Sequence, residues 1–171
     1  MEEAKIPENE QQRLAHLQNL HVLDTPVEER FERITRILRR VLDVPIAAVS
    51  LIDDRRQWFK SIQGLESVET PRNISFCSHA ILNDNTLVIP DTKLDPRFSN
   101  NPLVTGEPNV RFYAGHPLKI ADNIRVGTLC VFGTKPRSLQ PEDLQFLQDL
   151  ALTTSNELKT SMLKTLFTQR G

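Results

Sequence analysis

Two pairs of apolar segments, each joined by a short polar turn, place the strongest constraint on the fold. Residues 46–52 are apolar on both faces, and the polar turn 53–56 separates them from the second candidate strand, 57–63. Residues 111–120 and 125–133 form another such pair. Hairpins of this kind, flanked by helical segments, predict an α+β domain with an antiparallel sheet and helices mainly on one face.

Helical segments precede these strands. Asn9 precedes a segment that we expect to form a helix to about Leu20. Thr25, Pro26 and Glu28 match a capping box and predict the start of a second helix. Its apolar positions recur at helical spacing: Phe31, Ile34, Ile37, Leu38, Val41 and Leu42.

The rest of the chain is predicted to hold shorter or irregular elements and one long helix. Ser75 predicts the N-cap of a short helix over residues 76–82, and residues 87–89 predict a short strand. Residues 91–109 contain three prolines and are expected to form a long irregular loop, a type of segment that is often functional. Residues 141 to about 167 predict a final helix with acidic residues in its first turn.

Length and composition exclude several classes of function. The 171 residues suit one domain, and a net charge of −1 argues against nucleic-acid binding driven by bulk positive charge. The basic stripe Arg30, Arg33, Arg36 and Arg40 has glutamates beside it, so we interpret it as a solvated helix face. The start of the chain is acidic, and its longest apolar stretch is too short to span a membrane, so we expect no membrane insertion and a cytoplasmic location.

Cys77 is the most distinctive single residue. It lies near the predicted N-terminus of the helix over 76–82, a position that lowers the pKa of a thiol. One interpretation is a redox-sensing or ligand-contacting thiol, and the other is a small packing residue. A zinc site from Cys77, His79, His116 and Cys130 is conceivable, but no Cys-x-x-Cys spacing supports it, and we predict no metal site.

Strand alternation predicts a pocket. Arg111 and Tyr113 share one face of their strand, and Thr128 and Cys130 share one face of the next, with Val126 and Phe132 expected on that same face. We expect Arg111 and Tyr113 to project into a cavity beneath the 91–109 loop, with Asp91 nearby and Arg111 suited to an anionic group. In the alternative interpretation these side chains only bind backbone groups of the loop.

Short motifs spread over residues 10–158 together resemble one bacterial subgroup of GAF domains. They are Leu20–Pro26, Glu28–Phe31, Gln57–Ser61, Ser75–Ile81, Val88–Asp91, Asp95–Phe98, Asn100–Val104, Arg111–Gly115, Pro117–Leu118 and Gly127–Val131. The resemblance implies a central antiparallel sheet of five or six strands, terminal helices on one face and a loop-covered ligand pocket on the other. It divides a single GAF domain, 1–171, into an N-terminal helix and linker (1–25), a core (26–137) and a C-terminal helix (138–171).

The resemblance also implies a regulatory role. Such domains usually precede diguanylate cyclase, phosphodiesterase or histidine kinase output domains, which belong to cyclic di-GMP or two-component signalling. The chain contains no such output domain, so we expect either a sensor segment of a larger protein or a small stand-alone protein.

Departures from the family's better-known members narrow the function. The cyclic-nucleotide-binding signature is not found in order, and neither Cys77 nor Cys130 is followed by the histidine typical of bilin attachment. Relatives that reduce free methionine sulfoxide need a further cysteine in the segment matching 91–109, which has none. We therefore expect a non-catalytic sensory module that binds an unidentified small molecule or a partner. A thiol redox sensor through Cys77 is the alternative, and a methionine sulfoxide reductase-like enzyme is less favoured.

The last predicted helix suggests a homodimer through the terminal helices. Its apolar stripe, which is interrupted by Thr154, comprises Leu144, Leu147, Ala151, Leu158, Met162 and Leu166, and is widened by Leu150 and Leu163. The alternative is that this stripe covers only the domain's own sheet.

Overall fold

The computed structural model describes the backbone of residues 1–170 and the side chains of residues 1–163. Within that part of the chain, a six-stranded antiparallel sheet has the order β3-β2-β1-β6-β5-β4. The strands are β1 (Ile46–Ile52), β2 (Arg56–Gln63), β3 (Glu69–Pro71), β4 (Leu87–Ile89), β5 (Phe112–Ala121) and β6 (Ile124–Gly133). The two predicted hairpins, β1–β2 and β5–β6, are confirmed, and β1 and β6 pair at the centre.

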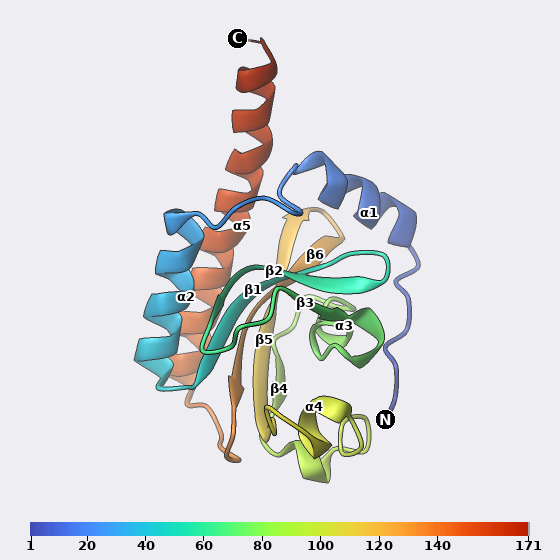
Figure 1. Cartoon of the computed structure of the whole chain (residues 1–171), viewed down its shortest axis with the longest axis vertical. Helices are drawn as coiled ribbons and strands as arrows, with labels where there is room; N and C mark the ends of the chain where they lie inside the picture. The colour runs from blue at the N-terminus through green and yellow to red at the C-terminus, as the bar shows by residue number, and fades with distance from the viewer. Residues whose placement is uncertain (171) are drawn as a thin grey trace.

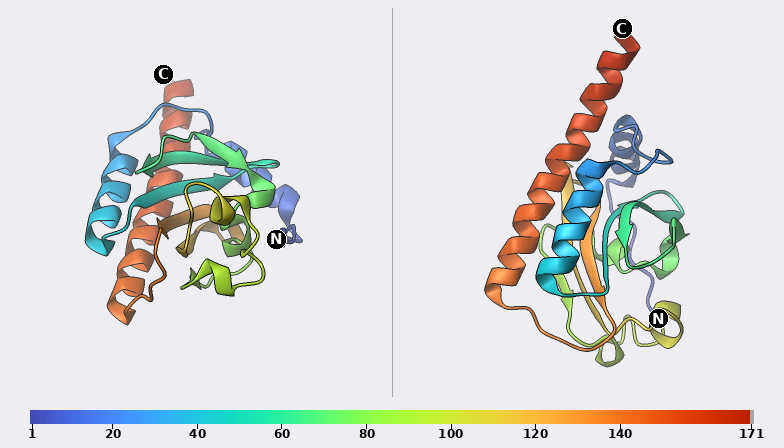
Figure 2. Two further views of the ribbon diagram at one scale, coloured as in Figure 1. Left: turned by 60° about the horizontal axis from the view of Figure 1, so that its bottom comes forward. Right: turned by 60° about the vertical axis from the view of Figure 1, so that its left-hand side comes forward.

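Long helices cover one face of this sheet. The helices are α1 (Glu10–Asn19), α2 (Glu29–Leu42), α3 (Cys77–Ala80), α4 (Pro102–Thr105) and α5 (Pro141–Arg170), with 3-10 turns η1 (Arg72–Ile74) and η2 (Thr92–Leu94). Helices α2 and α5 lie side by side on the sheet, while α1 lies apart from α2 and contacts β6 (Figure 1). Helices α3 and α4 lie on the opposite side (Figure 2).

Each face of the sheet has its own apolar core. On the helix face, Phe31 and Leu38 of α2 and Leu147 and Leu158 of α5 pack against Val131 and its neighbours on the strands. On the far face, Phe76, Phe98, Tyr113 and Phe132 pack together with both cysteines. The central strands are therefore buried on both sides, which explains why β1 is apolar at nearly every position.

Two irregularities in strand pairing change which face a side chain occupies. Lys60 has no partner in the register between β1 and β2, so the consecutive residues Lys60 and Ser61 both bond to groups on the helix side of the sheet. Val126 is likewise skipped between β5 and β6, and it packs in the core on the helix face. The expectation that Val126 shares the face of Thr128 and Cys130 was wrong for this reason.

The predicted capping box at Thr25 was also wrong. Helix α2 begins at Glu29, and the Thr25 hydroxyl donates to the carbonyl of Val22 at 2.5 Å instead of capping a helix. The same hydroxyl accepts a hydrogen bond from the ammonium of Lys60 at 2.8 Å. The local contact with Val22 and the long-range contact with Lys60 therefore replace the predicted cap.

The side chain of Asn9 does not cap α1 either. Its amide donates to the carbonyl of Asn123 at 2.7 Å, which ties the start of α1 to the turn between β5 and β6. Helix α3 spans Cys77–Ala80 rather than the predicted 76–82 and has Phe76 at its N-cap position, although the Ser75 hydroxyl still accepts a hydrogen bond from the Ser78 amide at 3.1 Å.

The charged stripe of α2 is occupied by ion pairs. Arg36 and Arg33 pair with Glu29, and Arg30 pairs with Glu28 and with Glu157 of α5. The exposed side chains of Arg33 and Arg36 agree with the prediction of a solvated face, whereas Arg30 is only 16% exposed and links α2 to α5.

The apolar stripe of α5 is used mainly within the domain. Leu147, Ala151 and Leu158 are buried in the core on the helix face, and Leu150 and Met162 are partly buried against it. Leu163 is exposed, and the side chain of Leu166 lies outside the described residues. The described part of the stripe therefore largely covers the domain's own sheet.

Candidate functional site

Four of the six predicted site residues meet at one point on the far face of the sheet. Cys77, the first residue of α3, lies against Tyr113 of β5 and against Thr128 and Cys130 of β6. The Tyr113 and Thr128 hydroxyls donate to Cys77 Sγ at 3.2 and 3.0 Å, and the two Sγ atoms are 3.7 Å apart. All four residues are fully buried. Strand alternation thus grouped the strand residues on the correct face.

The hydrogen bonds are directed at one sulfur atom and set its acidity. Burial opposes ionisation of Cys77, but the hydrogen bonds that its sulfur makes with Cys130, Thr128 and Tyr113 outweigh it and lower the pKa of Cys77 to about 7. Burial raises the pKa of Cys130, and the neighbouring Cys77 adds to that effect. Burial and the charge of Cys77 likewise raise the pKa of Tyr113. Cys77 is therefore the sulfur that ionises first.

Aromatic rings close this cluster on the side away from the sheet. The Tyr113 ring stacks on Phe76 at 5.2 Å between centroids and meets the Phe132 ring edge-on at 5.2 Å. Phe76 stacks in turn on Phe98 at 4.5 Å. This packing leaves the Cys77 sulfur buried.

Arg111 and Asp91 are not brought to this cluster by any described contact. The Arg111 guanidinium donates to the carbonyls of Val104 and Val110 at 2.8 and 3.2 Å. The Asp91 carboxylate accepts from the Lys93 amide and caps the 3-10 turn η2. Arg111 thus binds loop backbone, as the alternative interpretation expected, and the prediction that it projects into a cavity beside Tyr113 was wrong.

A small enclosed cavity does lie beneath the predicted loop, but other residues line it. Its volume is about 30 Å³, which is about the space of one water molecule. The lining is mostly apolar and comes from β1, β2, β3, β6 and the segment 103–110: Ile46, Gln57, Phe59, Ile62, Leu65, Thr70, Leu103, Pro108, Val110 and Phe132. The alternation of Gln57 and Phe59 along their strand was the signal that could have identified part of this lining.

A chain of hydrogen bonds leads from this cavity into the sheet. The side-chain Nε2 of Gln57 donates to the Thr70 hydroxyl at 2.9 Å, and the Ser50 hydroxyl donates to the side-chain Oε1 of Gln57 at 2.6 Å. Ser50 pairs across the sheet with Thr128, which contacts Cys77. Ser50 of β1 therefore connects the polar wall of the cavity, on β2 and β3, with Thr128 of the cysteine cluster on β6.

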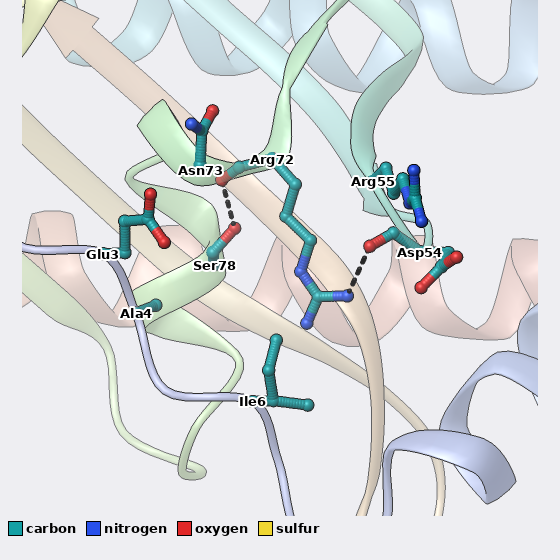
Figure 3. A pocket seen from close by; sticks show the side chains of 8 residues that line it. All are labelled: Glu3, Ala4, Ile6, Asp54, Arg55, Arg72, Asn73 and Ser78. Atoms are coloured by element: carbon teal, nitrogen blue, oxygen red, sulfur yellow. Dashed lines mark hydrogen bonds between the residues drawn. The ribbon is translucent and has the colours of Figure 1, made fainter.

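A second, more open hollow of about 380 Å³ lies between the N-terminal segment and α3. Figure 3 shows the Arg72 side chain extending across it, with Asp54 and Arg55 on one side and Glu3 and Ser78 on the other. The Arg72 guanidinium donates to the Asp53 and Asp54 carbonyls and forms an ion pair with Glu10 at 2.6 Å. Its charge is therefore already matched by a carboxylate of α1.

The two candidate histidine ligands lie away from the cysteines. His116 is bonded to Thr86 on the helix side of the sheet, and His79 contacts the Glu2 carbonyl and the Phe98 ring. Among the described residues, no group of three or more His, Cys, Asp or Glu side chains is arranged to hold a metal ion. No helix in the same part of the chain is long and apolar enough to cross a membrane.

Comparison with known proteins places the chain in a family. The family model described as "GAF domain" matches residues 26–158. A cyclic di-GMP phosphodiesterase of Pseudomonas aeruginosa is 42% identical over 146 residues, which are 85% of this chain and 25% of that protein. The chain therefore spans about a quarter of the length of this curated relative.

Solved structures share the fold at low sequence identity. The GAF domain of a phosphoenolpyruvate-protein phosphotransferase from Coxiella burnetii aligns with a TM-score of 0.68 at 16% identity, covering 91% of this chain and 96% of that one. A type II free methionine-R-sulfoxide reductase from Thermoplasma acidophilum aligns with a TM-score of 0.63 at 14% identity, covering 76% and 90%. Because the family model matches most of the chain and the sheet has the expected layers, this protein belongs to the GAF domain family.

Proposed function

We propose that the chain is a cytoplasmic, non-catalytic regulatory module that controls a cyclic di-GMP phosphodiesterase or a related output domain. The relationship to the P. aeruginosa enzyme supports this proposal, since the matched segment is a quarter of that protein and leaves room for the catalytic part elsewhere. The burial of Cys77, Tyr113, Thr128 and Cys130 supports a role without substrate turnover, because the packed cluster leaves no exposed surface on which an organic substrate could be held.

Helix α5 is the observation that carries the proposal. It continues to Arg170, beyond residue 158 where the family match ends. The helix packs on the sheet through Leu147, Ala151 and Leu158, and its C-terminal end projects past the sheet (Figure 1). A change in the sheet beneath the packed part would therefore move the projecting end as a lever.

The ligand site in this proposal is the small cavity on the far face. Phe132 of β6 lines the cavity, whereas the adjacent Val131 packs in the core beneath the helices. An occupant would therefore press on the strand that supports α5 from the other side. The lining is mainly apolar, with Gln57 and Thr70 as its polar residues, and because the cavity holds about one water molecule, a larger ligand would bind only if the cavity expands.

The proposed assembly is a homodimer in which two copies of α5 lie side by side. Leu152 and Leu163 of α5 are 65% and 50% exposed, and both are available for such a contact. Sedimentation equilibrium would test this with the intact chain and with a version that ends at Leu158. A dimer that is lost on truncation supports pairing through the end of α5, and a monomer in both cases contradicts it.

The output coupling can be tested in a fused enzyme. The chain would replace the matching segment of the P. aeruginosa phosphodiesterase, and cyclic di-GMP hydrolysis would be measured. Inserting two residues after Leu163 rotates the following helix by roughly 200°, whereas inserting seven residues returns it to nearly the same phase. We expect the two-residue insertion to change the hydrolysis rate and the seven-residue insertion to preserve it. Equal rates for both insertions and the unmodified fusion would contradict coupling through α5.

A further inference from the structure

The buried cysteine cluster has a chemical capacity that the sensor proposal does not use. Cys77 of α3 and Cys130 of β6 are the two cysteines of the chain. Their Sγ atoms are in direct contact, 3.7 Å apart. Both are free thiols. We propose that Cys77 and Cys130 form a redox pair that closes into an intramolecular disulfide under two-electron oxidation.

The movement needed is small and falls on one element. A disulfide has an S–S distance of about 2.05 Å, so the sulfurs must approach by less than about 2 Å. Cys130 is held in β6, which pairs with β1 on one side and β5 on the other. Cys77 belongs to α3, a helix of four residues. The shift therefore occurs in α3 rather than in the centre of the sheet.

The surroundings of the pair assign the two chemical roles. Tyr113 and Thr128 both donate hydrogen bonds to Cys77 Sγ, and such donors stabilise a thiolate at this atom. Cys130 is oriented toward the carbonyl of Ala48, with Sγ and oxygen 3.7 Å apart, which keeps its proton in place. Cys77 is therefore the attacking sulfur and Cys130 the resolving one.

With hydrogen peroxide as the oxidant, the atoms and electrons balance in two steps. The Cys77 thiolate attacks one peroxide oxygen, the O–O bond breaks, and hydroxide leaves to take up a proton, so Cys77 becomes a sulfenic acid and one water forms. Cys130 then loses its proton and attacks the Cys77 sulfur, and hydroxide leaves from that sulfur as a second water. Two thiols are oxidised, one peroxide is reduced, and the product is the disulfide.

Oxidation would change contacts at the surface of the domain by displacing α3. Ser78, the next residue, donates to the Arg72 carbonyl at the floor of the open hollow, and His79 contacts the Glu2 carbonyl of the N-terminal segment. Figure 3 shows Ser78 and Arg72 together at this hollow. A displacement of α3 therefore alters the contact between the N-terminal segment and the domain, without requiring the ligand or the output domain proposed above.

The test uses the whole chain, treated with hydrogen peroxide near neutral pH and then alkylated with iodoacetamide in denaturant. The proposal predicts a monomer on a non-reducing gel, a mass lower by two hydrogens, and loss of alkylation at both cysteines that dithiothreitol restores. Full alkylation of both cysteines after treatment, or a disulfide only between two chains, would overturn it.

Matched variants separate the two roles. Cys130→Ser should leave Cys77 as a sulfenic acid that dimedone traps, whereas Cys77→Ser should leave Cys130 unreactive toward peroxide. Thr128→Val removes one donor to Cys77 while keeping its shape, and it should slow disulfide formation several-fold at neutral pH and less at higher pH. Dimedone labelling of Cys130 in the Cys77→Ser variant, or the absence of labelling in Cys130→Ser, would contradict the assigned roles.

Discussion

Replacing Glu10 by glutamine should destabilise the domain in a pH-dependent way. Glu10 is the carboxylate that joins α1 to the rest of the fold, since it pairs with Arg13 at 2.7 Å and with Arg72 at 2.6 Å. Its side chain is 16% exposed, and those of Arg13 and Arg72 are 1% and 8% exposed. Glutamine keeps the size of the side chain but removes the charge that the two guanidinium groups share.

The size of the effect follows from the acidity of this carboxyl. Burial opposes its ionisation, but the hydrogen bonds and charges of Arg13 and Arg72 outweigh it and lower the pKa of Glu10 from 4.5 to about 2. At about 1.4 kcal/mol for each pH unit, the difference between these two pKa values corresponds to about 3 kcal/mol. Because the pKa is lower in the folded state, this stability is present above pH 4.5 and is lost as the pH falls toward 2.

Urea denaturation followed by the fluorescence of Trp58 would measure it, because this single tryptophan is 4% exposed in the folded state. We expect Glu10→Gln to lower the free energy of unfolding by about 3 kcal/mol at pH 7, with the gap from the unmodified protein closing as the pH is lowered. Glu29→Gln is the control, since Glu29 also pairs with arginine but is 59% exposed, and it should leave stability unchanged. A gap that stays the same at pH 7 and pH 3, or no gap at pH 7, would refute the reasoning.

Two further substitutions test the packing that positions the site. Gly127→Ala should cost about 3 kcal/mol, the upper end of overpacking costs, because a Cβ atom there would lie 1.8 Å from the Ser50 carbonyl oxygen. Gly106→Ala is the milder control, because a Cβ atom there would lie 3.2 Å from the nearest atom, the Pro102 carbonyl oxygen. Equal melting temperatures for the two variants would contradict this expectation. Asn101→Ala should cost about 1–2 kcal/mol, because Asn101 caps α4 and its amide donates to the Ile74 carbonyl at 3.0 Å. An unchanged urea midpoint for Asn101→Ala would show that neither contact matters.

Strands with a clear apolar pattern were predictable, and those without one were not. The first strand was predicted over residues 46–52 and has those bounds, because both of its faces are buried. Strand β3 was missed because its three residues, Glu69–Pro71, are partly exposed at the sheet edge and carry no alternating pattern. Edge strands pair through backbone groups, which the side-chain pattern does not report.

Local helix signals failed where a distant residue competed for the same atom. The Thr25 hydroxyl satisfies the sequence rule for a cap, but Lys60 and the Val22 carbonyl occupy it. Lys60 reaches the Thr25 hydroxyl because the pairing of β2 is irregular at Lys60, and the local sequence pattern does not predict this irregularity. The start of α2 could not be placed from the 25–28 segment alone.

The candidate site was likewise predictable only in part. Alternation along β5 and β6 correctly placed Tyr113 and Cys130 on the far face, because side-chain parity is a local property. It could not show that aromatic rings would fill the space around them, nor that Arg111 would turn to the Val104 carbonyl. Those outcomes depend on how the 91–109 segment packs, which its irregular sequence does not determine.

The most direct test of the account is whether the small cavity on the far face controls an output domain attached to α5. In the fused phosphodiesterase, cyclic di-GMP hydrolysis would be compared for Leu103→Trp and Leu94→Trp. Leu103 lines the cavity, so tryptophan there fills it, whereas Leu94 lies in the same loop region and is 81% exposed. We expect a changed hydrolysis rate for Leu103→Trp and an unchanged rate for Leu94→Trp, with both fusions folded by circular dichroism. A folded Leu103→Trp fusion that hydrolyses cyclic di-GMP at the unmodified rate would contradict it.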